Sequence, residues 1–453
     1  MDSKRTSKVS ATRLGRLGKM GGLIGGIVGG ALREGAGRLA KGERSSMRDL
    51  MLTPANLERV ATQMAQLRGA AMKVGQLLSM DSGQLMPPEL SQLMDRLRSD
   101  ADAMPPGQLK SVLQEAWGAQ WQNQFSEFDF RPFAAASIGQ VHRGVLSTGE
   151  RVAIKIQYPG IRRSIDSDVD NVALLLRLVN IVPKEFELAP LLEEAKHQLH
   201  QEADYRQEAS FMSQYAASLM GFDRFNVPNP ISALTTERVL VMTWCEGVAI
   251  DQLVQASAAV RNQIVHDLMH LFFHELFLLQ KVQTDPNFAN FLYDHSTQQI
   301  QLLDFGATRV YTNTMVDAYR DLLRCALLGD REGSFSAAQR IGYFSGAITE
   351  AQQTAVLELF ELVLEPLRSD VPYDFGQSNL AQRVREVGLR LSFEQDYWHS
   401  PPVAALFLHR KLAGLYLLAV RLQAVVDLRP LRFWLEGTSG AYPEFLKPSA
   451  PSL

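Results

Sequence analysis

The chain has 453 residues, of which 46% are hydrophobic and 21% are charged, and its net charge is −3. This length suggests roughly two to four domains with ample core, and the composition is ordinary for a soluble globular protein. A charge so close to zero gives no reason to expect nucleic acid along the whole surface. The two cysteines, Cys245 and Cys325, are too few for a disulfide framework or a structural zinc site and suit a reducing compartment.

The first 45 residues differ from the rest of the chain. Basic residues dominate up to Lys19, and a glycine-rich apolar run follows at 21–32, with glycines spaced as in close helix contacts within membranes. Three interpretations stay open: a flexible tail, a membrane anchor or partner-binding helix drawn to anionic lipid, or a targeting peptide. No uncharged run reaches the ~20 residues that an ordinary membrane-spanning helix needs.

The next elements are expected in the order helix, strand, helix. Apolar residues recur at helical spacing over 46–104, and a further helix is predicted over 105–125, ending near Gly118. The pattern then changes to strands over 128–158, with a hairpin turn at 147–150. Residues 163–220 read as helical, with breaks near Pro183 and Pro190, and two short strands are predicted at 231–233 and 238–243.

The second half reads as mainly helical. Helices are expected from 250 to 282, and again from 306 to 438 with turns at Gly329, Gly342 and 401–402. Strands followed by helices are the order of an α+β, bilobal protein-kinase-like fold with an N-terminal helical extension and a helix-rich C-lobe. The boundaries that we predict are 1–45 for the basic segment, 46–106 for the extension, 107–246 for the N-lobe, 247–440 for the C-lobe and 441–453 for the tail.

The most informative motif lies within residues 283–306. Asp285 is followed five positions later by Asn290 and, after an apolar strand, by Asp304-Phe-Gly. Kinases use such an Asp to address the attacking hydroxyl, while the Asn and the second Asp hold magnesium at the phosphates. Asp-Phe-Gly alone occurs often by chance, but the spacing of all three residues favours a phosphate-and-magnesium site.

A second motif lies upstream, where Val152-Ala-Ile-Lys155 resembles the strand that carries a phosphate-binding lysine. Such a lysine needs a carboxylate on a helix, and the segment 201–209 offers Glu202, Asp204 and Glu208. If this segment is one helix, Asp204 and Glu208 share a face. Glu202 lies about 200° from Asp204, so both reach one atom only if the helix end is irregular. A solvated acidic face is the plainer alternative.

Three departures argue against a standard protein kinase. The loop that should cover the phosphates, residues 134–140, is alanine-rich where glycines are usual. Alanine excludes most conformations with positive φ. Gln283 occupies the place of the usual His before the catalytic Asp, and no Ala-Pro-Glu follows Asp-Phe-Gly. The sequence pattern therefore lacks the segment that docks peptide substrates, so peptide phosphorylation is not expected.

These motifs together resemble the UbiB family of atypical kinases, also called aarF-domain or ABC1-type kinases, over roughly residues 55–430. Lys73-Val-Gly-Gln76 looks like the K-x-G-Q signature and Glu202-Ala-Asp204 like the E-x-D motif. The segment from Gln283 to Asn290 is most similar to the coenzyme Q8-like branch. No pair of C-terminal membrane spans, which another branch carries, is visible in the sequence.

The resemblance implies a site and a function. Asp285, Lys155 and Glu208 are implied as catalytic, with Glu208 the partner of Lys155, and Asn290 and Asp304 as magnesium ligands. The implied nucleotide-binding and family-specific set is Ala134, Ala135, Ala136, Ser137, Ile138, Gly139, Lys155, Glu246, Lys73, Gln76, Glu202 and Asp204. The family binds ATP or ADP with Mg²⁺, shows ATPase activity and supports ubiquinone biosynthesis.

We therefore expect an ATP-dependent atypical kinase or ATPase at a membrane surface. Its expected partners are adenine nucleotide and lipid or ubiquinone intermediates or the enzymes that make them, without nucleic acid, and a homodimer is possible. A bacterial cytoplasmic location, peripheral to the membrane, is favoured by the lack of a long presequence; the matrix side of the mitochondrial inner membrane is the alternative. A nucleotide-gated scaffold or lipid chaperone, and a small-molecule kinase of the aminoglycoside-phosphotransferase type, are alternative functions.

Overall fold

A computed structural model describes residues 64, 67–81, 104–178, 188–344, 348–391 and 401–436. The chain divides into two compact units. Unit 1 holds the described residues up to Ala209 together with 230–244, and unit 2 holds 210–229 and the described residues from Cys245 onward. The basic segment 1–45 with its run at 21–32, the tail 441–453 and most of the expected helices over 46–104 lie outside the described residues.

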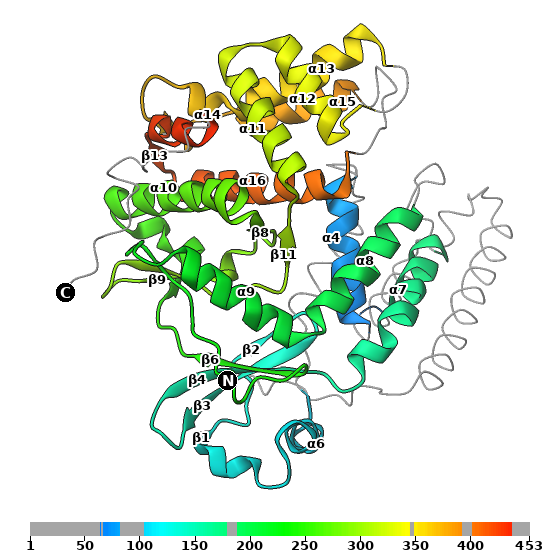
Figure 1. The fold of residues 1–453 in the computed structure, drawn as a ribbon, viewed down its shortest axis with the longest axis vertical. Coiled ribbons are helices and arrows are strands. Elements are labelled where there is room, and N and C mark those ends of the chain that lie inside the picture. The colour runs from blue at the N-terminus through cyan, green and yellow to red at the C-terminus, as the bar shows by residue number, and fades with distance from the viewer. Residues whose placement is uncertain are drawn as a thin grey trace, which may run out of the picture. The chain divides into compact units, whose positions relative to one another are not determined.

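Unit 1 is built on an antiparallel sheet (Figure 1) with strand order β1–β3–β4–β6, to which β2 adds by pairing with β3. The predicted hairpin at 147–150 joins β3 to β4, and Gly149 supplies the positive φ of 88° that this turn requires. The strands are β1 (Phe125–Phe128), β2 (Ala134–Ala135), β3 (Gly139–Leu146), β4 (Arg151–Gln157) and β6 (Val239–Thr243).

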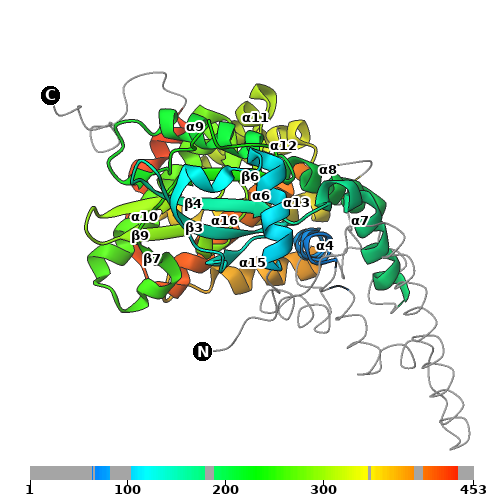
Figure 2. The same cartoon turned by 90° about the horizontal axis from the view of Figure 1, so that it is seen from below.

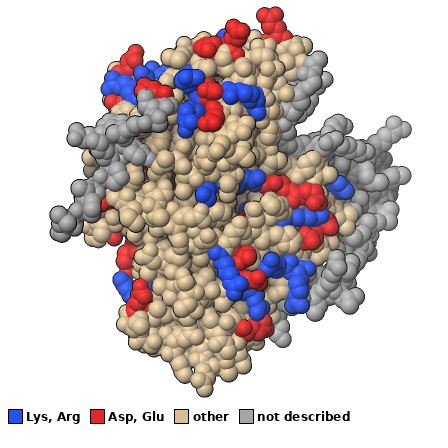
Figure 3. Space-filling view, viewed as in Figure 1, with Lys and Arg blue, Asp and Glu red and all other residues tan. Residues whose placement is uncertain are grey.

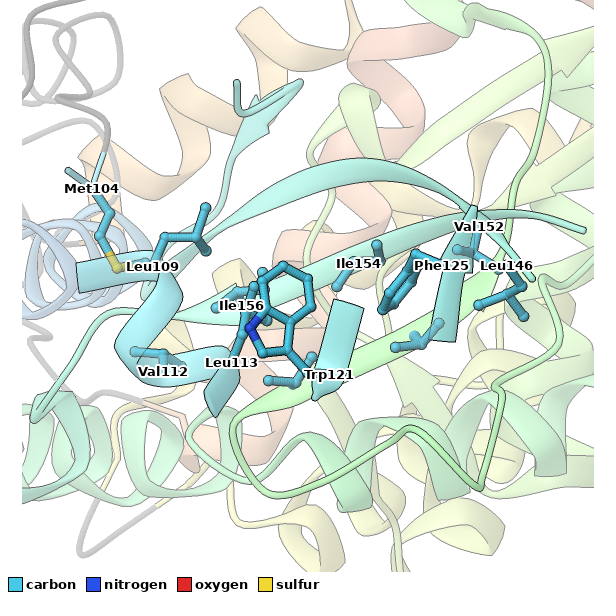
Figure 4. Close-up of a cluster of buried hydrophobic side chains, with 12 residues drawn as sticks. Met104, Leu109, Val112, Leu113, Trp121, Phe125, Leu146, Val152, Ile154 and Ile156 are labelled. Carbon is cyan, nitrogen blue, oxygen red and sulfur yellow. The ribbon is translucent and has the colours of Figure 1, made fainter. Parts of the chain in front are cut away.

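One face of this sheet packs against α6 (Pro106–Trp117) and the following 3-10 turn Trp121–Gln124. Successive side chains of a strand point to opposite faces, so Val152, Ile154 and Ile156 of β4 enter this core (Figure 4), which also contains Leu109 and Trp121. The alternation places Lys155 on the opposite face of the sheet. The predicted end of α6 at Gly118 is confirmed, since Gly118 has φ 85° and caps the helix.

Three further helices of unit 1 pack against one another (Figure 2): α4 (Arg68–Asp81), α7 (Ile161–Leu178) and α8 (Leu188–Glu202). The helix α9 (Tyr205–Ser218) starts in unit 1 and ends in unit 2, whose boundary falls after Ala209. The region 163–220 is therefore helical as predicted in its described part. Pro183 lies outside the described residues, and α8 begins two residues before Pro190. The break between α8 and α9, inside the acidic run at 201–209, was not predicted.

Unit 2 combines many helices with small sheets (Figure 1). A four-stranded sheet has the order β5–β10–β9–β7, and β8 pairs with β11. Short polar side chains cap the starts of three helices: Thr312 for α11, Asp330 for α12 and Thr349 for α13. Glycines end two of these helices with positive φ, Gly329 at 74° after α11 and Gly342 at 100° after α12. These two predicted turns are confirmed.

The regular elements of unit 2, besides the end of α9, are as follows. Its strands are β5 (Phe225–Asn226), β7 (Val248–Ala249), β8 (Lys281–Gln283), β9 (Phe291–Asp294), β10 (Gln299–Leu302), β11 (Thr308–Val310), β12 (Tyr373–Asp374) and β13 (Val425–Val426). Its α-helices are α10 (Ala258–His274), α11 (Asn313–Leu328), α12 (Arg331–Ile341), α13 (Glu350–Val363), α14 (Glu365–Arg368), α15 (Leu380–Leu389) and α16 (Val403–Arg421). The 3-10 turns are Ile250–Gln255, Phe288–Asn290 and Arg429–Leu435, and a π-helical turn spans Glu275–Leu279.

Several predicted element types were wrong. The strand expected at 231–233 is a turn, because Thr235 bonds back to Ile231 and only Pro230 forms an isolated bridge with Met242. The first strand of unit 1 begins at Phe125 rather than 128. The stretches expected to be wholly helical contain β8, β11, β12 and β13. Strands of two or three residues are too short for alternation to distinguish them from loops.

One described helix, α16, is long and apolar enough to cross a membrane. Arg410 and Lys411 lie near its middle, and much of its surface is buried within unit 2, including Phe407 and Leu415. Charged side chains at mid-helix are costly in lipid. We therefore regard α16 as a core helix of unit 2.

Charges of both signs share the surface. On the face that Figure 3 shows, Lys and Arg side chains lie in small groups close to Asp and Glu side chains. Ion pairs such as Arg331 with Glu361 and Arg340 with Asp321 are examples within unit 2. Such interspersed charges create no strong long-range field of one sign on this face.

Two buried histidines on α10 make the stability of unit 2 depend on pH. His270 and His274 pack against Phe222 and Trp434, and burial lowers their pKa values to about 3 and about 4. Nearby His266 opposes, and Asp267 favours, protonation of His270. Below pH about 6.5 the unfolded chain binds these protons while the folded chain does not. The free energy of unfolding should therefore fall as the pH falls from about 6.5 towards 4.

Replacing His270 by phenylalanine tests this expectation. The variant lacks one of the protons that bind on unfolding. Its free energy of unfolding should therefore depend on pH less steeply than that of the wild type, by up to about 1.4 kcal/mol per pH unit. Urea titrations at several pH values would measure the two slopes. The exposed His295 provides the control, since His295→Gln should keep the wild-type slope. Equal slopes for His270→Phe and wild type would contradict the expectation.

Candidate functional site

Unit 1 contains a buried ion pair on the face of its sheet opposite α6. Lys155 Nζ donates to both oxygens of Glu208, at 2.8 Å and 2.9 Å, and lies 5.2 Å from the centre of the Tyr205 ring. The side chains of Lys155 and Glu208 are 10% and 3% exposed. A bidentate contact of this kind fixes the direction of the ammonium group.

The break between α8 and α9 determines which acidic residue reaches Lys155. Asp204 lies between the helices and accepts a hydrogen bond from the backbone N–H of Arg206. Glu208 then falls in the first turn of α9 and points to β4, while Glu202 ends α8. The acidic run is thus not one helix, so Asp204 and Glu208 do not share a helical face. The helix end is irregular at this point, and Glu202 and Glu208 contact two different lysines, Lys73 and Lys155.

Glu202 connects two other parts of unit 1. It forms a salt bridge with the buried Lys73 of α4, and its Oε2 accepts a hydrogen bond of 3.1 Å from Ser137 Oγ. Gly69, one turn before Lys73, lies against the same loop, since an added Cβ would be 3.1 Å from Ile138 Cγ2 and 3.3 Å from the Ser137 carbonyl oxygen. The helix with the K-x-G-Q motif therefore contacts the alanine-rich loop directly.

The alanine-rich loop is the tight connection between β2 and β3. Ala134 and Ala135 pair with β3, and the N–H of Ala136 donates to the carbonyl of Gly139. At Gly139 glycine is required for space, because an added Cβ would lie 2.3 Å from the Ile156 carbonyl oxygen. The position has no positive φ, so close approach to β4 rather than backbone freedom explains the glycine.

Buried polar groups support the strand that follows this loop. Gln140 accepts from the backbone N–H of Met104 and lies 2.7 Å from His142 Nε2. His142 Nδ1 lies 2.8 Å from the carbonyl oxygen of Asp129, so Nδ1 carries the hydrogen and Nε2 accepts from Gln140. Burial lowers the pKa of His142. A neutral imidazole thus completes this network.

In unit 2, strand pairing brings the two parts of the Asp285–Asn290–Asp304 motif together. β8 pairs with β11. Thr284 follows β8 directly, and both its N–H and its hydroxyl donate to the carbonyl of Ala307. The N–H of Leu303 donates to the carbonyl of Asn290. These hydrogen bonds hold the segment 284–290 beside 303–307, on which Asp304 lies.

Asp285 is held at both carboxylate oxygens. Asn290 Nδ2 donates to Oδ2 at 2.9 Å, and Arg410 Nη2 of α16 donates to Oδ1 at 2.9 Å. The Asp285 side chain is 23% exposed and that of Arg410 16%. A carboxylate in this setting keeps lone pairs for a further donor, such as a water molecule or a substrate hydroxyl.

Asn290 and Asp304 are suited to hold magnesium. The amide nitrogen of Asn290 faces Asp285, so the amide oxygen is directed away from that carboxylate, and Asp304 Oδ1 accepts the backbone N–H of Gly306 at 2.9 Å. Both are hard oxygen donors, which Mg²⁺ prefers. The described residues contain no cluster of three His, Cys, Asp or Glu side chains that could hold a metal alone. One or two protein ligands completed by phosphates is the usual arrangement for Mg²⁺.

A buried polar network lies beneath this segment and was not predicted. Lys411 Nζ of α16 donates to Gln283 Oε1 at 3.1 Å and lies 3.7 Å from Glu275 Oε2. The hydroxyl of Tyr215 lies 3.0 Å from Glu275 Oε1, and burial raises the pKa values of both groups. A cavity of about 10 Å³ adjoins Glu275, Gln283, Asn290 and Asp304. The sequence signal was present, since two adjacent basic residues within an apolar helix indicate buried partners.

The remaining predicted residues occupy the following positions. Gln76 is half-buried on α4, one turn after Lys73, and Glu246 is exposed just after the boundary between the units. Ile138 is buried under the alanine-rich loop and contacts α4. In unit 1 the structure brings Lys73, Ser137 and Glu202 together and, as a separate contact, pairs Lys155 with Glu208. In unit 2 it pairs Asp285 with Asn290 and ties Asn290 to the segment that carries Asp304.

Comparison with known proteins places this arrangement in a family. The ABC1 atypical kinase-like domain matches residues 96–337. The mitochondrial atypical kinase COQ8 of Saccharomyces cerevisiae is 37% identical over 433 residues, covering 95% of this chain and 86% of the relative. The mitochondrial atypical kinase COQ8B of Rattus norvegicus is 39% identical over 444 residues, covering 96% and 83%.

A solved structure shows the same fold. The Rv3197–erythromycin complex from Mycobacterium tuberculosis has a TM-score of 0.56 and 23% sequence identity, covering 83% of this chain and 95% of that one. The predicted α+β kinase-like fold is thereby confirmed. The family match and the relatives together show that the chain belongs to the ABC1, or UbiB, family of atypical kinases and is similar to its COQ8-type members over nearly its whole length.

Proposed function

We propose that this protein binds ATP with magnesium and hydrolyses it or transfers its γ-phosphoryl group. Lys155, oriented by Glu208, binds the α- and β-phosphates, and Asn290 and Asp304 bind the metal. Asp285 orients the attacking water or hydroxyl. The observation that carries the proposal is the hydrogen bond between Asn290 and Asp285, together with the backbone hydrogen bond that ties Asn290 to Leu303, the neighbour of Asp304. The spacing and the donor types of these three residues match the needs of phosphoryl transfer.

Magnesium would supply charge neutralisation at the phosphate oxygens. The groups of this chain perform the remaining tasks. The ammonium of Lys155 is desolvated and has a fixed direction, so its interaction with phosphate is stronger than it would be in water. Asp285 cannot rotate freely, because Asn290 and Arg410 each hold one of its oxygens. Such preorganisation is the main source of catalysis in phosphoryl transfer.

The proposed acceptor is water or a small molecule rather than a peptide. Lys73 is buried in its salt bridge with Glu202, and Glu202 also binds the alanine-rich loop. Helix α4 thus occupies the neighbourhood of that loop in unit 1. The missing Ala-Pro-Glu segment supports the same conclusion.

We further propose a role in ubiquinone biosynthesis at a membrane surface. Two relatives that match nearly the whole chain are named COQ8 or COQ8B and are mitochondrial. The site would then act on lipid-like ubiquinone intermediates or on the enzymes that make them. We propose that the protein lies peripheral to the membrane. ADP would be the product, and no nucleic acid partner is proposed.

Replacing Asp304 by asparagine tests the nucleotide and metal roles together. In the wild type, ATP with Mg²⁺ at about a hundredfold above the dissociation constant should stabilise the fold by about 2.7 kcal/mol. Removing Mg²⁺ with EDTA should abolish most of this gain. Asp304→Asn lowers the charge at the metal, so the magnesium-dependent part should shrink in the variant. Thermal unfolding with ATP, with and without Mg²⁺, measures both effects.

The same variant separates an enzyme from a scaffold. Cells that lack the protein should contain little ubiquinone, and the wild-type chain should restore it while Asp304→Asn should not. Full restoration by Asp304→Asn would favour a scaffold role. No stabilisation of the wild type by ATP with Mg²⁺ would contradict nucleotide binding itself.

A further inference from the structure

One helix of unit 2, α16, holds the segment that carries Asp285. Three of its residues face this segment: Arg410, Lys411 and Gly414. Arg410 and Gly414 are four positions apart and so lie on the same face of the helix. None of these residues belongs to the sequence motifs of the proposed site, and they lie more than a hundred residues downstream of it.

The contact of Arg410 with Asp285 is direct and partly buried. Arg410 Nη2 lies 2.9 Å from Asp285 Oδ1, and the two side chains are 16% and 23% exposed. Asn290 Nδ2 holds the other oxygen at 2.9 Å. With two donors from different directions, the carboxylate plane has one preferred orientation. Within residues 284–290 no side chain is basic, so the positive charge at Asp285 comes from α16.

The neighbouring contacts of α16 hold Arg410 beside the segment that carries Asp285. Lys411 Nζ donates to Gln283, two residues before Asp285, at 3.1 Å. Gly414 brings the backbone of α16 against Pro286, because an added Cβ would lie 2.2 Å from the Cβ of that proline. The helix therefore meets the segment at 283, 285 and 286 in succession. A displacement of α16 would move Asp285 with it.

We propose that Arg410 is the positioning residue for Asp285, which it orients for attack by water or a hydroxyl group. This inference rests on the proposed function. Arg410 acts through Asp285 and not through the nucleotide, so its removal should slow turnover and leave the binding of ATP with Mg²⁺ largely intact. Lysine at this position keeps the charge but loses the planar geometry of the guanidinium.

Steady-state ATP hydrolysis tests the proposal. Arg410→Ala should lower kcat about tenfold to a hundredfold, since small misplacements of a reacting group cost this much. KM and the dissociation constant for a fluorescent ATP analogue with Mg²⁺ should change less than about threefold, because ground-state binding is untouched. Arg410→Lys should recover part of the loss. The matched control is Arg421→Ala at the end of α16, where the arginine pairs with Asp251 and is 53% exposed; it should keep the wild-type kcat.

Hydrogen exchange provides a readout that does not depend on turnover. In Arg410→Ala, amides of the segment 284–291 should exchange faster than in the wild type and in Arg421→Ala. An unchanged kcat and unchanged exchange in Arg410→Ala would overturn the inference, as would a loss of kcat that Arg410→Lys does not reduce. If the wild type neither hydrolyses ATP nor transfers its γ-phosphoryl group, the proposed function fails, whereas faster exchange at 284–291 in Arg410→Ala would still support the positioning by Arg410.

Discussion

Replacing Asp285 by asparagine is expected to lower the turnover number for ATP hydrolysis at least about a hundredfold while nucleotide still binds, because a positioned general base contributes a factor of this size. Asparagine has the same shape, so Asn290 can still donate to its side-chain oxygen. The amide cannot accept a proton at working pH. Since Asp285 is not a proposed metal ligand, the dissociation constant for ATP with Mg²⁺ should change less than about threefold.

The measurement compares kcat and nucleotide affinity in the same preparation. Asp317→Asn is the control, since Asp317 lies on the surface of α11 in the same unit, with its side chain 64% exposed. That variant should have wild-type turnover. Wild-type turnover in Asp285→Asn would remove Asp285 from the mechanism, and loss of nucleotide binding would instead indicate a role in the ground state.

The contrast with Asp304→Asn makes the two carboxylates distinguishable. Asp304 accepts the N–H of Gly306 and lies on the segment tied to Asn290, whereas Asp285 is bound by Asn290 and Arg410. We propose that Asp304 is a metal ligand and that Asp285, held at both oxygens, is aimed at the attacking water or hydroxyl group. We therefore expect Asp304→Asn to weaken magnesium-dependent binding and Asp285→Asn to spare it.

Local sequence patterns predicted the parts of the site that depend on nearby residues. The alternation of Val152, Ile154 and Ile156 with Lys155 follows from strand geometry, and it places the lysine away from the core. The spacing of Asp285 and Asn290 is likewise short enough for one turn to bring them together. The kinase-like fold followed from the order of strands and helices together with these motifs.

Contacts between distant segments could not be predicted in the same way. Arg410 and Asp285 are 125 residues apart, and nothing in their local patterns links them. The divergence of Glu202 and Glu208 depends on a helix break at 203–204, which the composition of an acidic run does not reveal. The short strands β12 and β13 depend on pairing with each other, since two residues have no detectable periodicity.

The closeness of α16 to the Asp285 segment leads to the second large effect. Gly414 lies inside a helix, where glycine is usually less favourable than alanine by about 1 kcal/mol. On propensity alone, Gly414→Ala should stabilise the protein. The added methyl group, however, would lie 2.2 Å from Pro286 Cβ and 3.1 Å from its Cγ. Proline is rigid, so the helix or the segment must move.

We expect Gly414→Ala to lower the free energy of unfolding by about 1–3 kcal/mol, the usual cost of overpacking a buried contact. It should also lower kcat about tenfold or more, because the movement displaces Asp285, the neighbour of Pro286. Urea unfolding measures the first effect. Turnover should be measured at a temperature at which the variant is fully folded, so that the two effects stay separate.

Gly388 on α15 is the matched control. It is also a helical glycine of unit 2, but an added Cβ would meet no heavy atom within 4 Å outside its own helix and chain neighbours. Gly388→Ala should therefore stabilise the protein by up to about 1 kcal/mol through helix propensity and leave kcat unchanged. If Gly414→Ala behaves like Gly388→Ala, the helix does not constrain the segment. Opposite signs for the two variants would show that α16 fixes the position of Asp285 through backbone contact as well as through Arg410.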